Sequence, residues 1–244
     1  MSDRGSDGFG MVKRGRHLGP SLATTMNDHG SLRGHWSSLL SAHVPDLDRI
    51  YSSSERVFPA RDRVFRAFSA TPHEKVRVVL LGQDPYDTAG RADGLAFSQR
   101  GPIAKDSALH RIFLNLERDP EVSFSRPVQG DLTKWAHEGV LLLNAALTVV
   151  EDTAGSHLAA WKSFTRAVLR SLSDPGRKIV FILLGGDAVK FGLPALKGVP
   201  IDRIIRAAHP MAGFPGNERP FHSAHVFSET NLALRPREPV DWSL

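Results

Sequence analysis

VRVVLLGQDPY, residues Val76–Tyr86, is an apolar run that ends abruptly in a polar turn. The apolar part is Val76–Leu81, and similar runs follow at Val140–Leu143 (VLLL), Ile179–Leu184 (IVFILL) and Ile201–Ala208 (IDRIIRAA). The first three runs are almost continuously apolar, which is typical of parallel strands covered on both faces. The fourth run alternates more, and this predicts a strand nearer an edge of the sheet.

Helical patterns lie between these runs, at Arg61–Phe68, Ser107–Arg118 and Ala160–Leu172. Strands that alternate with helices predict an α/β fold, here a single domain with a central, mainly parallel four-stranded sheet flanked by helices. We expect the domain to span residues 31–244, because no repeat or linker interrupts that stretch. Residues 1–30 are rich in Gly, Ser, Arg and Asp without periodicity, which predicts a flexible basic tail.

The composition excludes several classes of protein. The 244 residues include 31 Lys+Arg, 26 Asp+Glu and no cysteine, and the formal net charge is +5. Without cysteine there is no disulfide framework, no thiol catalysis and no Cys-ligated zinc or iron–sulfur site. The apolar runs are too short to span a bilayer and the N-terminus lacks a secretory pattern, so a soluble cytoplasmic protein is the default expectation. The basic charge is a weak hint of a polyanionic partner.

Chemistry-bearing side chains follow the predicted strands. Asp84 comes after the first run, Asn144 after the second and His209 after the fourth. In open α/β sheets a ligand binds outside the carboxyl ends of the strands, so these three residues are expected to meet in one pocket.

The richest segment is GQDPYDTAGRADGLAFS, residues Gly82–Ser98. Its proline and glycines suit a rigid loop that presents Asp84 and brings backbone N–H groups close to a ligand. Phe97 in this segment suits a stacking wall. Taken alone, these residues have plainer explanations: an Asp after a strand is often a cap or turn former, and a Phe is more often part of the core.

The same segment closely resembles the first signature of family 1 uracil-DNA glycosylases, GQDPYHGPGQAHGLAFS. GDLTKWAHEGVLLLNAALTV (Gly130–Val149) is similar to that family's second signature, and HSAHVFSETN (His222–Asn231) and PVDW (Pro239–Trp242) also match its pattern. The resemblance covers roughly residues 35–244, with the motifs in the right order and at the right spacings. It implies a DNA repair enzyme that flips uracil out of DNA and hydrolyses its N-glycosidic bond, leaving an abasic site.

The resemblance assigns roles to particular residues. Asp84 matches the catalytic aspartate, which orients water and stabilises positive charge on the sugar. His209 matches the histidine that hydrogen-bonds uracil O2 as the base leaves, in place of the capped turn that a lone His-Pro would otherwise suggest. The uracil-binding set is completed by the Gln83 backbone N–H at O2, Tyr86 against C5, Phe97 as the stacking wall and Asn144 reading the base edge. Ser107 resembles a serine that touches a DNA phosphate and equally suits a helix N-cap.

Two departures from the family pattern concern the DNA interface. Asp87 replaces a histidine, and we expect it either to weaken DNA binding or to pair with a cation such as Arg91. The family's HPSPLS loop, which inserts a leucine into the base stack, reads HPMAGF (His209–Phe214) here. We expect a different wedge, and the candidate DNA-binding residues are Ser107, Pro210, Met211, Phe214 and Arg219. The family's small acidic inhibitor engages that leucine, so weak or no inhibitor binding is predicted.

Other readings stay open beside this one. A related glycosylase of altered base preference is opposed by Tyr86 for thymine and by Asn144 for hypoxanthine. A catalytically weak module that binds uracil-containing or abasic DNA is a second alternative, whereas GGDAVK (Gly185–Lys190) does not fit a P-loop. No cofactor and no metal are expected. The motifs contain no amine nucleophile, so the expected enzyme is monofunctional. We also expect a monomer that acts on single- or double-stranded uracil DNA.

Overall fold

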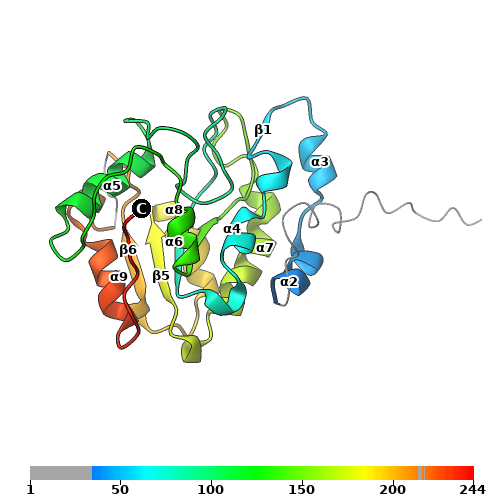
Figure 1. Cartoon of the computed structure of the whole chain (residues 1–244). Coiled ribbons are helices and arrows are strands. Elements are labelled where there is room, and N and C mark those ends of the chain that lie inside the picture. The colour runs from blue at the N-terminus through cyan, green and yellow to red at the C-terminus, as the bar shows by residue number, and fades with distance from the viewer. Residues whose placement is uncertain (1–34, 214–215, 217) are drawn as a thin grey trace, which may run out of the picture.

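The computed structural model describes residues 35–213, 216 and 218–244. The tail expected at residues 1–30 and the wedge candidate Phe214 lie outside the described residues. Figure 1 shows a central sheet with helices on both sides. The helices are α2 (His35–His43), α3 (Leu47–Tyr51), α4 (Arg66–Ala70), α5 (Ala108–Arg118), α6 (Thr133–His137), α7 (Leu158–Leu172), α8 (Gly186–Gly192) and α9 (Val226–Leu234).

The main sheet has four strands, β2 (Val78–Gly82), β3 (Val140–Asn144), β5 (Val180–Leu184) and β6 (Ile204–Ala207). Their order is β3-β2-β5-β6 and every pair is parallel, which confirms the predicted fold. All residues of β2, β3 and β5 are buried, as their continuous apolar runs predict. The alternating run forms β6 at one edge, also as predicted.

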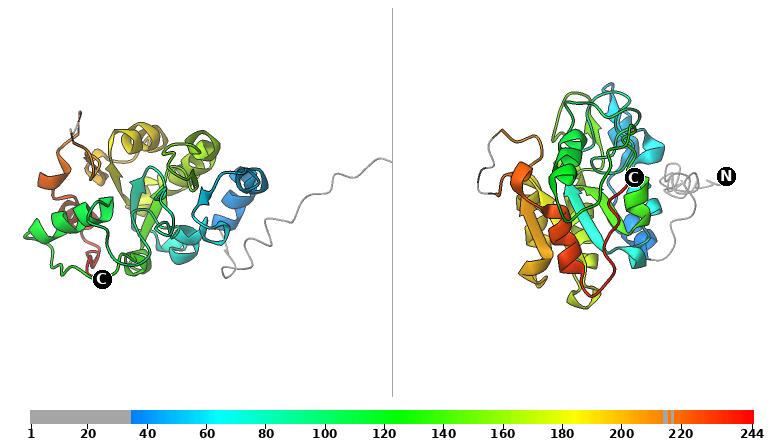
Figure 2. Two further views of the ribbon diagram at one scale, coloured as in Figure 1. Left: turned by 90° about the horizontal axis from the view of Figure 1, so that it is seen from above. Right: turned by 60° about the vertical axis from the view of Figure 1, so that its left-hand side comes forward.

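Helices on the two sides exclude water from the sheet. Figures 1 and 2 show α7 and α8 on one side and α5, α6 and α9 on the other. On the α8 side, Gly192 lies so close to the sheet that an added Cβ would come within 2.8 Å of Leu81. The other side contains a cluster of Trp135, Phe227 and Trp242 with ring centroids 4.9–6.0 Å apart. These contacts fix the strand ends from which the site is built.

Two elements differ from the prediction. Residues Ile201–Arg203 form a 3₁₀ turn rather than the start of a strand, because Pro200 precedes it and Ile201 is turned out to solvent with 76% of its surface exposed. The helix predicted over Arg61–Phe68 is divided into a 3₁₀ turn at Arg61–Arg63 and α4. The break lies at Phe65, whose φ of −103° and ψ of 16° leave the helical region.

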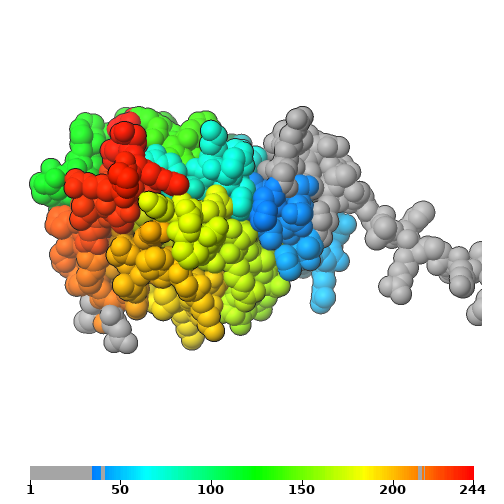
Figure 3. Space-filling model, turned by 90° about the horizontal axis from the view of Figure 1, so that it is seen from below, coloured from blue at the N-terminus to red at the C-terminus, as the bar shows by residue number. Residues whose placement is uncertain are grey.

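A small antiparallel pair, β1 (Val57–Phe58) with β4 (Val149–Val150), was not predicted because two-residue strands carry no periodicity. The remaining 3₁₀ turns are His73–Lys75, Pro175–Arg177, Leu193–Ala195 and Phe221–Ser223. Figure 3 views the molecule from below, where yellow and gold segments between α7 and β6 reach the surface. This end of the sheet lies opposite the loops that follow the strands.

Candidate active site

The carboxyl ends of the strands place the predicted site residues in one region. Asn144 is the last residue of β3 and stands opposite Gly82, the last residue of β2, in the register of the sheet. Asp84 follows β2 by two residues, and His209 follows β6 by two residues. Figure 2 looks down on this end of the molecule from above in its left panel. The parallel topology thus produces the convergence that the sequence predicts.

Gly82 is required by the close approach of two site side chains. A Cβ on this residue would lie 2.5 Å from Asn144 Oδ1 and 3.3 Å from the Phe97 ring. Only glycine leaves room for both groups, so the amide and the ring lie side by side at the end of β2.

The His209 ring adjoins the same group. Its centroid is 6.2 Å from that of Phe97. Gly185 lies beneath it with φ +100°, and a Cβ there would come within 2.9 Å of His209 Cβ. Asn144, Phe97 and His209 therefore border one space.

Phe97 is held in an unusual backbone conformation. Its φ is 64°, in the left-handed region that a bulky residue rarely adopts, and it is 8% exposed. Such a conformation costs on the order of 1–3 kcal/mol and persists only where neighbours enforce it. Here the Tyr86 hydroxyl donates to Phe97 O at 3.2 Å and accepts from Leu109 N at 3.3 Å. Tyr86 thereby ties the Phe97 turn to the start of α5.

Within the described residues, one oxygen of the Asp84 carboxylate is hydrogen-bonded and the other is not. Asp84 Oδ2 accepts from Gly155 N and from Gln83 Nε2, each at 2.7 Å. Asp84 Oδ1 is buried and has no partner among the described residues. Burial raises the pKa of this carboxyl, and the two hydrogen bonds oppose that rise. The geometry leaves one basic oxygen free for a donor that is not part of the protein.

A second buried acceptor lies at the end of the neighbouring strand β3. Asn144 is 6% exposed, and its Oδ1 has no hydrogen-bond partner in the described part of the chain. Leaving a buried acceptor unpaired costs about 1–3 kcal/mol. Two such atoms at the ends of neighbouring strands indicate a site shaped for a ligand with donors.

The contacts of His209 define its protonation. Met211 N donates to His209 Nδ1 at 3.2 Å, so Nδ1 is an acceptor and the neutral ring carries its hydrogen on Nε2. Burial lowers the pKa of His209, and the nearby Asp187 carboxylate opposes this only in part. At neutral pH the ring therefore offers an uncharged N–H donor.

Sequence reasoning missed two residues of this site, Gly155 and His157. Gly155 donates to Asp84, as described above. Thr148 Oγ1 accepts from Trp161 Nε1 at 2.7 Å, so its own hydrogen is free for His157 Nδ1 at 2.9 Å. The Asp84 charge acts on His157, although burial dominates and lowers the pKa of that imidazole. Neither residue directly follows a strand that the sequence predicts, so the strand-end pattern could not identify them.

Among residues 35–213, 216 and 218–244, no cluster of three or more His, Asp or Glu side chains is arranged to hold a metal ion. No described helix has the length and apolarity needed to cross a membrane.

Comparison with known proteins shows to which family the chain belongs. The family profile described as "Uracil DNA glycosylase superfamily" matches residues 68–229, which include each strand-end residue named above. The chain belongs to this superfamily.

Named relatives agree over most of the chain. A uracil-DNA glycosylase of Acinetobacter baumannii (strain SDF) is 39% identical over 219 residues, covering 85% of this chain and 89% of that protein. A uracil-DNA glycosylase of Streptococcus uberis is 40% identical over 202 residues, covering 80% and 88%. Among solved structures, a mimivirus UNG variant in complex with UGI superposes with a TM-score of 0.69 at 26% identity, covering 87% of this chain and 84% of that one.

The features in which this chain departs from the glycosylase pattern have their own contacts. Arg91 pairs with Asp106 at 3.5 Å rather than with Asp87, so that expected pairing is wrong. Asp87 has no ion-pair partner in the described part of the chain. Arg219 is held by Glu229 through bonds of 2.6 and 2.8 Å, because the carboxylate matches both nitrogens of its guanidinium.

The remaining candidates for DNA contact differ in exposure. Met211 is 44% exposed, whereas Pro210 is buried. Ser107 is 2% exposed and caps α5, accepting from His110 N at 3.1 Å and donating to Ala104 O at 2.6 Å. The N-cap alternative for Ser107 is thus the one observed, and its contact with phosphate stays a prediction.

Proposed function

We propose that the protein removes uracil from DNA by hydrolysing the N-glycosidic bond and leaves an abasic site. The observation that carries this proposal is the pair of unpartnered buried oxygens, Asp84 Oδ1 just after β2 and Asn144 Oδ1 at the end of β3, the second of which borders the space beside Phe97 and neutral His209. The superfamily and the relatives named uracil-DNA glycosylase support it. The enzyme is a monofunctional glycosylase of base excision repair.

Asn144 distinguishes uracil from cytosine. Its free Oδ1 accepts from uracil N3–H, and its amide nitrogen donates to O4. Cytosine offers a lone pair at N3 and an amino group at C4, so both contacts would set like groups against each other. A buried mismatch of this kind costs several kcal/mol, enough to exclude the normal base.

Phe97 and Tyr86 define the shape of the pocket. The Phe97 ring provides a stacking face for the base. Tyr86 stands against C5, so that a thymine methyl group would collide with its ring. Its two hydrogen bonds, to Phe97 O and from Leu109 N, hold the ring in place and make this clash hard to relieve.

Asp84 and His209 act on the two sides of the bond that breaks. The C1′–N1 electron pair leaves with uracil, while the free Asp84 oxygen orients a water and stabilises positive charge on the sugar. The water oxygen bonds to C1′, and its proton goes to the carboxylate and then to solvent or uracil. His209 Nε2–H and the Gln83 backbone N–H donate to O2, where the negative charge of leaving uracil collects.

The loop after His209 forms part of the DNA interface in this proposal. The uridine must flip out of the helix, and an exposed side chain has to fill the gap that it leaves. Met211 is the best supported wedge, because it is exposed and its own N–H is fixed on His209. Pro210 shapes the backbone beside it, whereas the salt bridge to Glu229 limits Arg219 to the rim.

The proposal also covers the DNA substrate, the place where the protein acts and its response to the family's inhibitor. Uracil in single- or double-stranded DNA is the substrate, bound by a monomer in the cytoplasm, where the DNA lies. The family's acidic inhibitor is expected to bind weakly, because the leucine that it engages is absent from residues 209–214. Tight stoichiometric inhibition would refute this part of the proposal.

A fluorescent oligonucleotide with a single uracil tests the proposal. The protein is incubated with it in EDTA, single- or double-stranded, and abasic sites are cleaved with hot alkali, with Asp84→Asn as the matched variant. Cleavage that the substitution abolishes or greatly slows is the expected result. Binding without cleavage would favour a module that holds uracil-containing or abasic DNA, and release of another base would favour a glycosylase of altered preference.

A further inference from the structure

A cavity of about 330 Å³ adjoins the active site on the side of α7 and α8. Three cations line it, Lys162 and Arg166 from α7 and Lys190 from α8, together with one carboxylate, Asp187. Its other lining residues are Gln83, Ala145, Leu158, Ala159 and Phe191. The lining charges sum to a surplus of positive charge, so the cavity suits an anion.

The three cations are free to bind a ligand. None of them forms an ion pair with any described residue, whereas many other arginines do; examples are Arg56 with Glu151, Arg61 with Asp48, Arg66 with Asp93, Arg126 with Glu117, Arg206 with Glu218 and Arg219 with Glu229. The Arg166 guanidinium lies over the Phe191 ring, 5.5 Å from its centroid, and its buried Nε has no hydrogen-bond partner among the described groups. This cation–π contact restrains the guanidinium beside the cavity.

The cavity and the active site share neighbouring residues. Gln83 precedes Asp84 and binds its carboxylate, and Ala145 directly follows Asn144. Asp187, which also lines the cavity, is close enough to His209 to oppose the burial effect on the pKa of that ring. An anion in this cavity therefore lies beside the reacting nucleotide and not at a remote surface.

We propose that this cavity binds a backbone phosphate of the DNA strand that carries the uracil. The inference rests on the proposed function, since it names a contact of the same substrate. The planar Arg166 fork suits two phosphate oxygens, while Lys162 and Lys190 add point charges from two helices. This contact positions the strand and is formed equally before and during bond cleavage, so it acts on binding and not on the chemical step.

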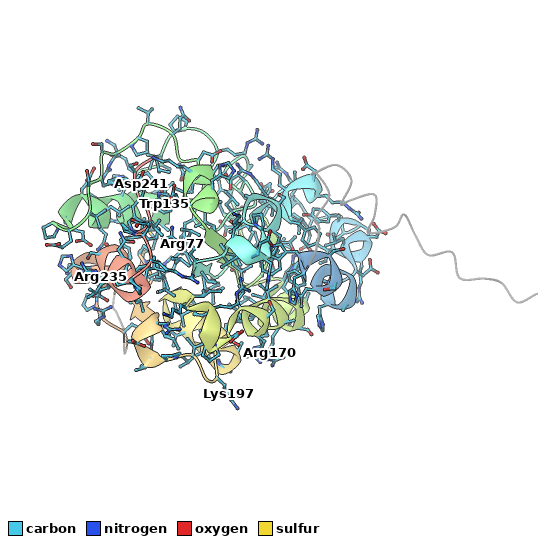
Figure 4. All side chains as sticks on the ribbon, turned by 60° about the horizontal axis from the view of Figure 1, so that its bottom comes forward. Arg77, Trp135, Arg170, Lys197, Arg235 and Asp241 are labelled. Carbon is cyan, nitrogen blue, oxygen red and sulfur yellow. The ribbon has the colours of Figure 1, made fainter. Side chains whose placement is uncertain are left out.

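The first test is the salt dependence of binding and turnover. A triple variant, Lys162→Gln with Arg166→Gln and Lys190→Gln, is compared with a control of equal charge change, Arg170→Gln with Lys178→Gln and Lys197→Gln. The control residues are exposed, and Figure 4 shows Arg170 and Lys197 at the lower end of the molecule. The substrate is a single-stranded oligonucleotide with one uracil.

The cavity variant is expected to raise KM roughly tenfold at low salt with kcat unchanged. The slope of log KM against log salt should fall by about 0.7, the value for one phosphate contact on a single strand. The control should keep the wild-type slope. Equal slopes in both variants, or a loss confined to kcat, would overturn the inference. If the wild type fails to cleave, the proposed function fails first, so the two failures are distinguishable.

The second test locates the phosphate. Single methylphosphonate linkages, which remove one charge, are placed in turn along the oligonucleotide. One linkage should raise KM for the wild type but leave KM of the cavity variant unchanged, since the two changes remove the same contact. Losses that add at every linkage would contradict the proposal. Competition by millimolar inorganic phosphate without any sensitive linkage would identify the cavity as a site for free phosphate and overturn it as well.

Discussion

Gly155 N donates a 2.7 Å hydrogen bond to Asp84 Oδ2 across 71 residues of sequence, from the loop before α7 to the loop after β2. Together with the Gln83 amide it holds one carboxylate oxygen, while the other has no partner among the described residues. A backbone donor cannot rotate away, so the carboxylate is oriented by the fold before any substrate arrives. Preorganisation of this kind is a main source of catalytic power.

Asp84→Asn should lower kcat/KM by about 10²–10⁴-fold, because the amide can neither orient water as a base nor stabilise positive charge. Protein stability should respond in the opposite direction. Burial raises the pKa of Asp84 in the folded protein. Ionisation of Asp84 therefore lowers the free energy of unfolding once the pH rises above the pKa of this group in the unfolded chain. The neutral variant is therefore expected to unfold at the same or a higher temperature at pH 7. A variant that loses activity together with several degrees of Tm would contradict this separation.

Gln83→Leu removes a donor that lowers the pKa of Asp84. The carboxyl then ionises at a higher pH. In a plot of log kcat/KM against pH, the acidic limb should therefore shift to higher pH relative to the wild type. Above that limb the activity should approach the wild-type plateau. A uniform loss at all pH values would show that the side chain acts only on geometry.

Gly82→Ala should displace the Asn144 amide, because the new Cβ would stand 2.5 Å from its Oδ1. A lost or strained hydrogen bond to uracil corresponds to roughly a 10–100-fold lower kcat/KM. Gly176→Ala is the matched control, since its Cβ meets only the Asp174 side chain at 3.3 Å at the far end of the sheet. Equal activity of the two variants would rule out a tight fit between Gly82 and Asn144.

Tyr86→Ala should admit thymine, which is detected as base release from an oligonucleotide without uracil. Tyr86→Phe keeps the ring and should remain selective for uracil, although it loses hydrogen bonds to Phe97 O and Leu109 N worth about 1 kcal/mol each. Thymine release by both variants would indicate that selectivity comes from the hydroxyl. No release by either would place the C5 contact elsewhere.

His73 should make stability depend on pH. Its ring stacks on His35 at 4.1 Å and faces the Arg177 guanidinium, and burial beside that cation lowers its pKa to about 4. The unfolded chain binds a proton near 6.5 and the folded chain does not, so the free energy of unfolding should fall as the pH drops from about 6.5 to 4. His73→Gln should flatten this part of the denaturation profile, and an unchanged profile would contradict the assignment.

The sheet could be predicted because its strands are marked by continuous apolar runs. The ends of Val140–Asn144 and Val180–Leu184 fall within one residue of the runs seen in the sequence. The convergence of Asn144 and His209 followed from the topology alone, since parallel strands bring their carboxyl ends to one edge. The resemblance to the glycosylase family then supplied roles that spacing could not.

Side-chain partners could not be predicted, because they depend on packing between distant segments. Asp87 is nearer to Arg91 in the sequence than Asp106 is. In the folded protein, however, Arg91 pairs with Asp106. Arg219 is a predicted DNA-contact residue, and its ion pair with Glu229 of α9 had no signal in the sequence. The bond from Gly155 to Asp84 has no local signal at all, since it depends on where the loop before α7 lies.

The position of β6 at the edge of the sheet makes the activity sensitive to partial unfolding. In the described sheet β6 pairs only with β5 and half of its residues are incompletely buried, yet it leads directly to His209; β3, at the opposite edge, carries Asn144 but is buried along its whole length. An edge strand can detach in a local opening that leaves the rest of the sheet intact. Such an opening would remove the leaving-group donor while most amide protons stayed protected from exchange. Activity would then depend on whether this one strand is paired with the sheet, and it would be lost at a lower temperature than that of the global melting transition.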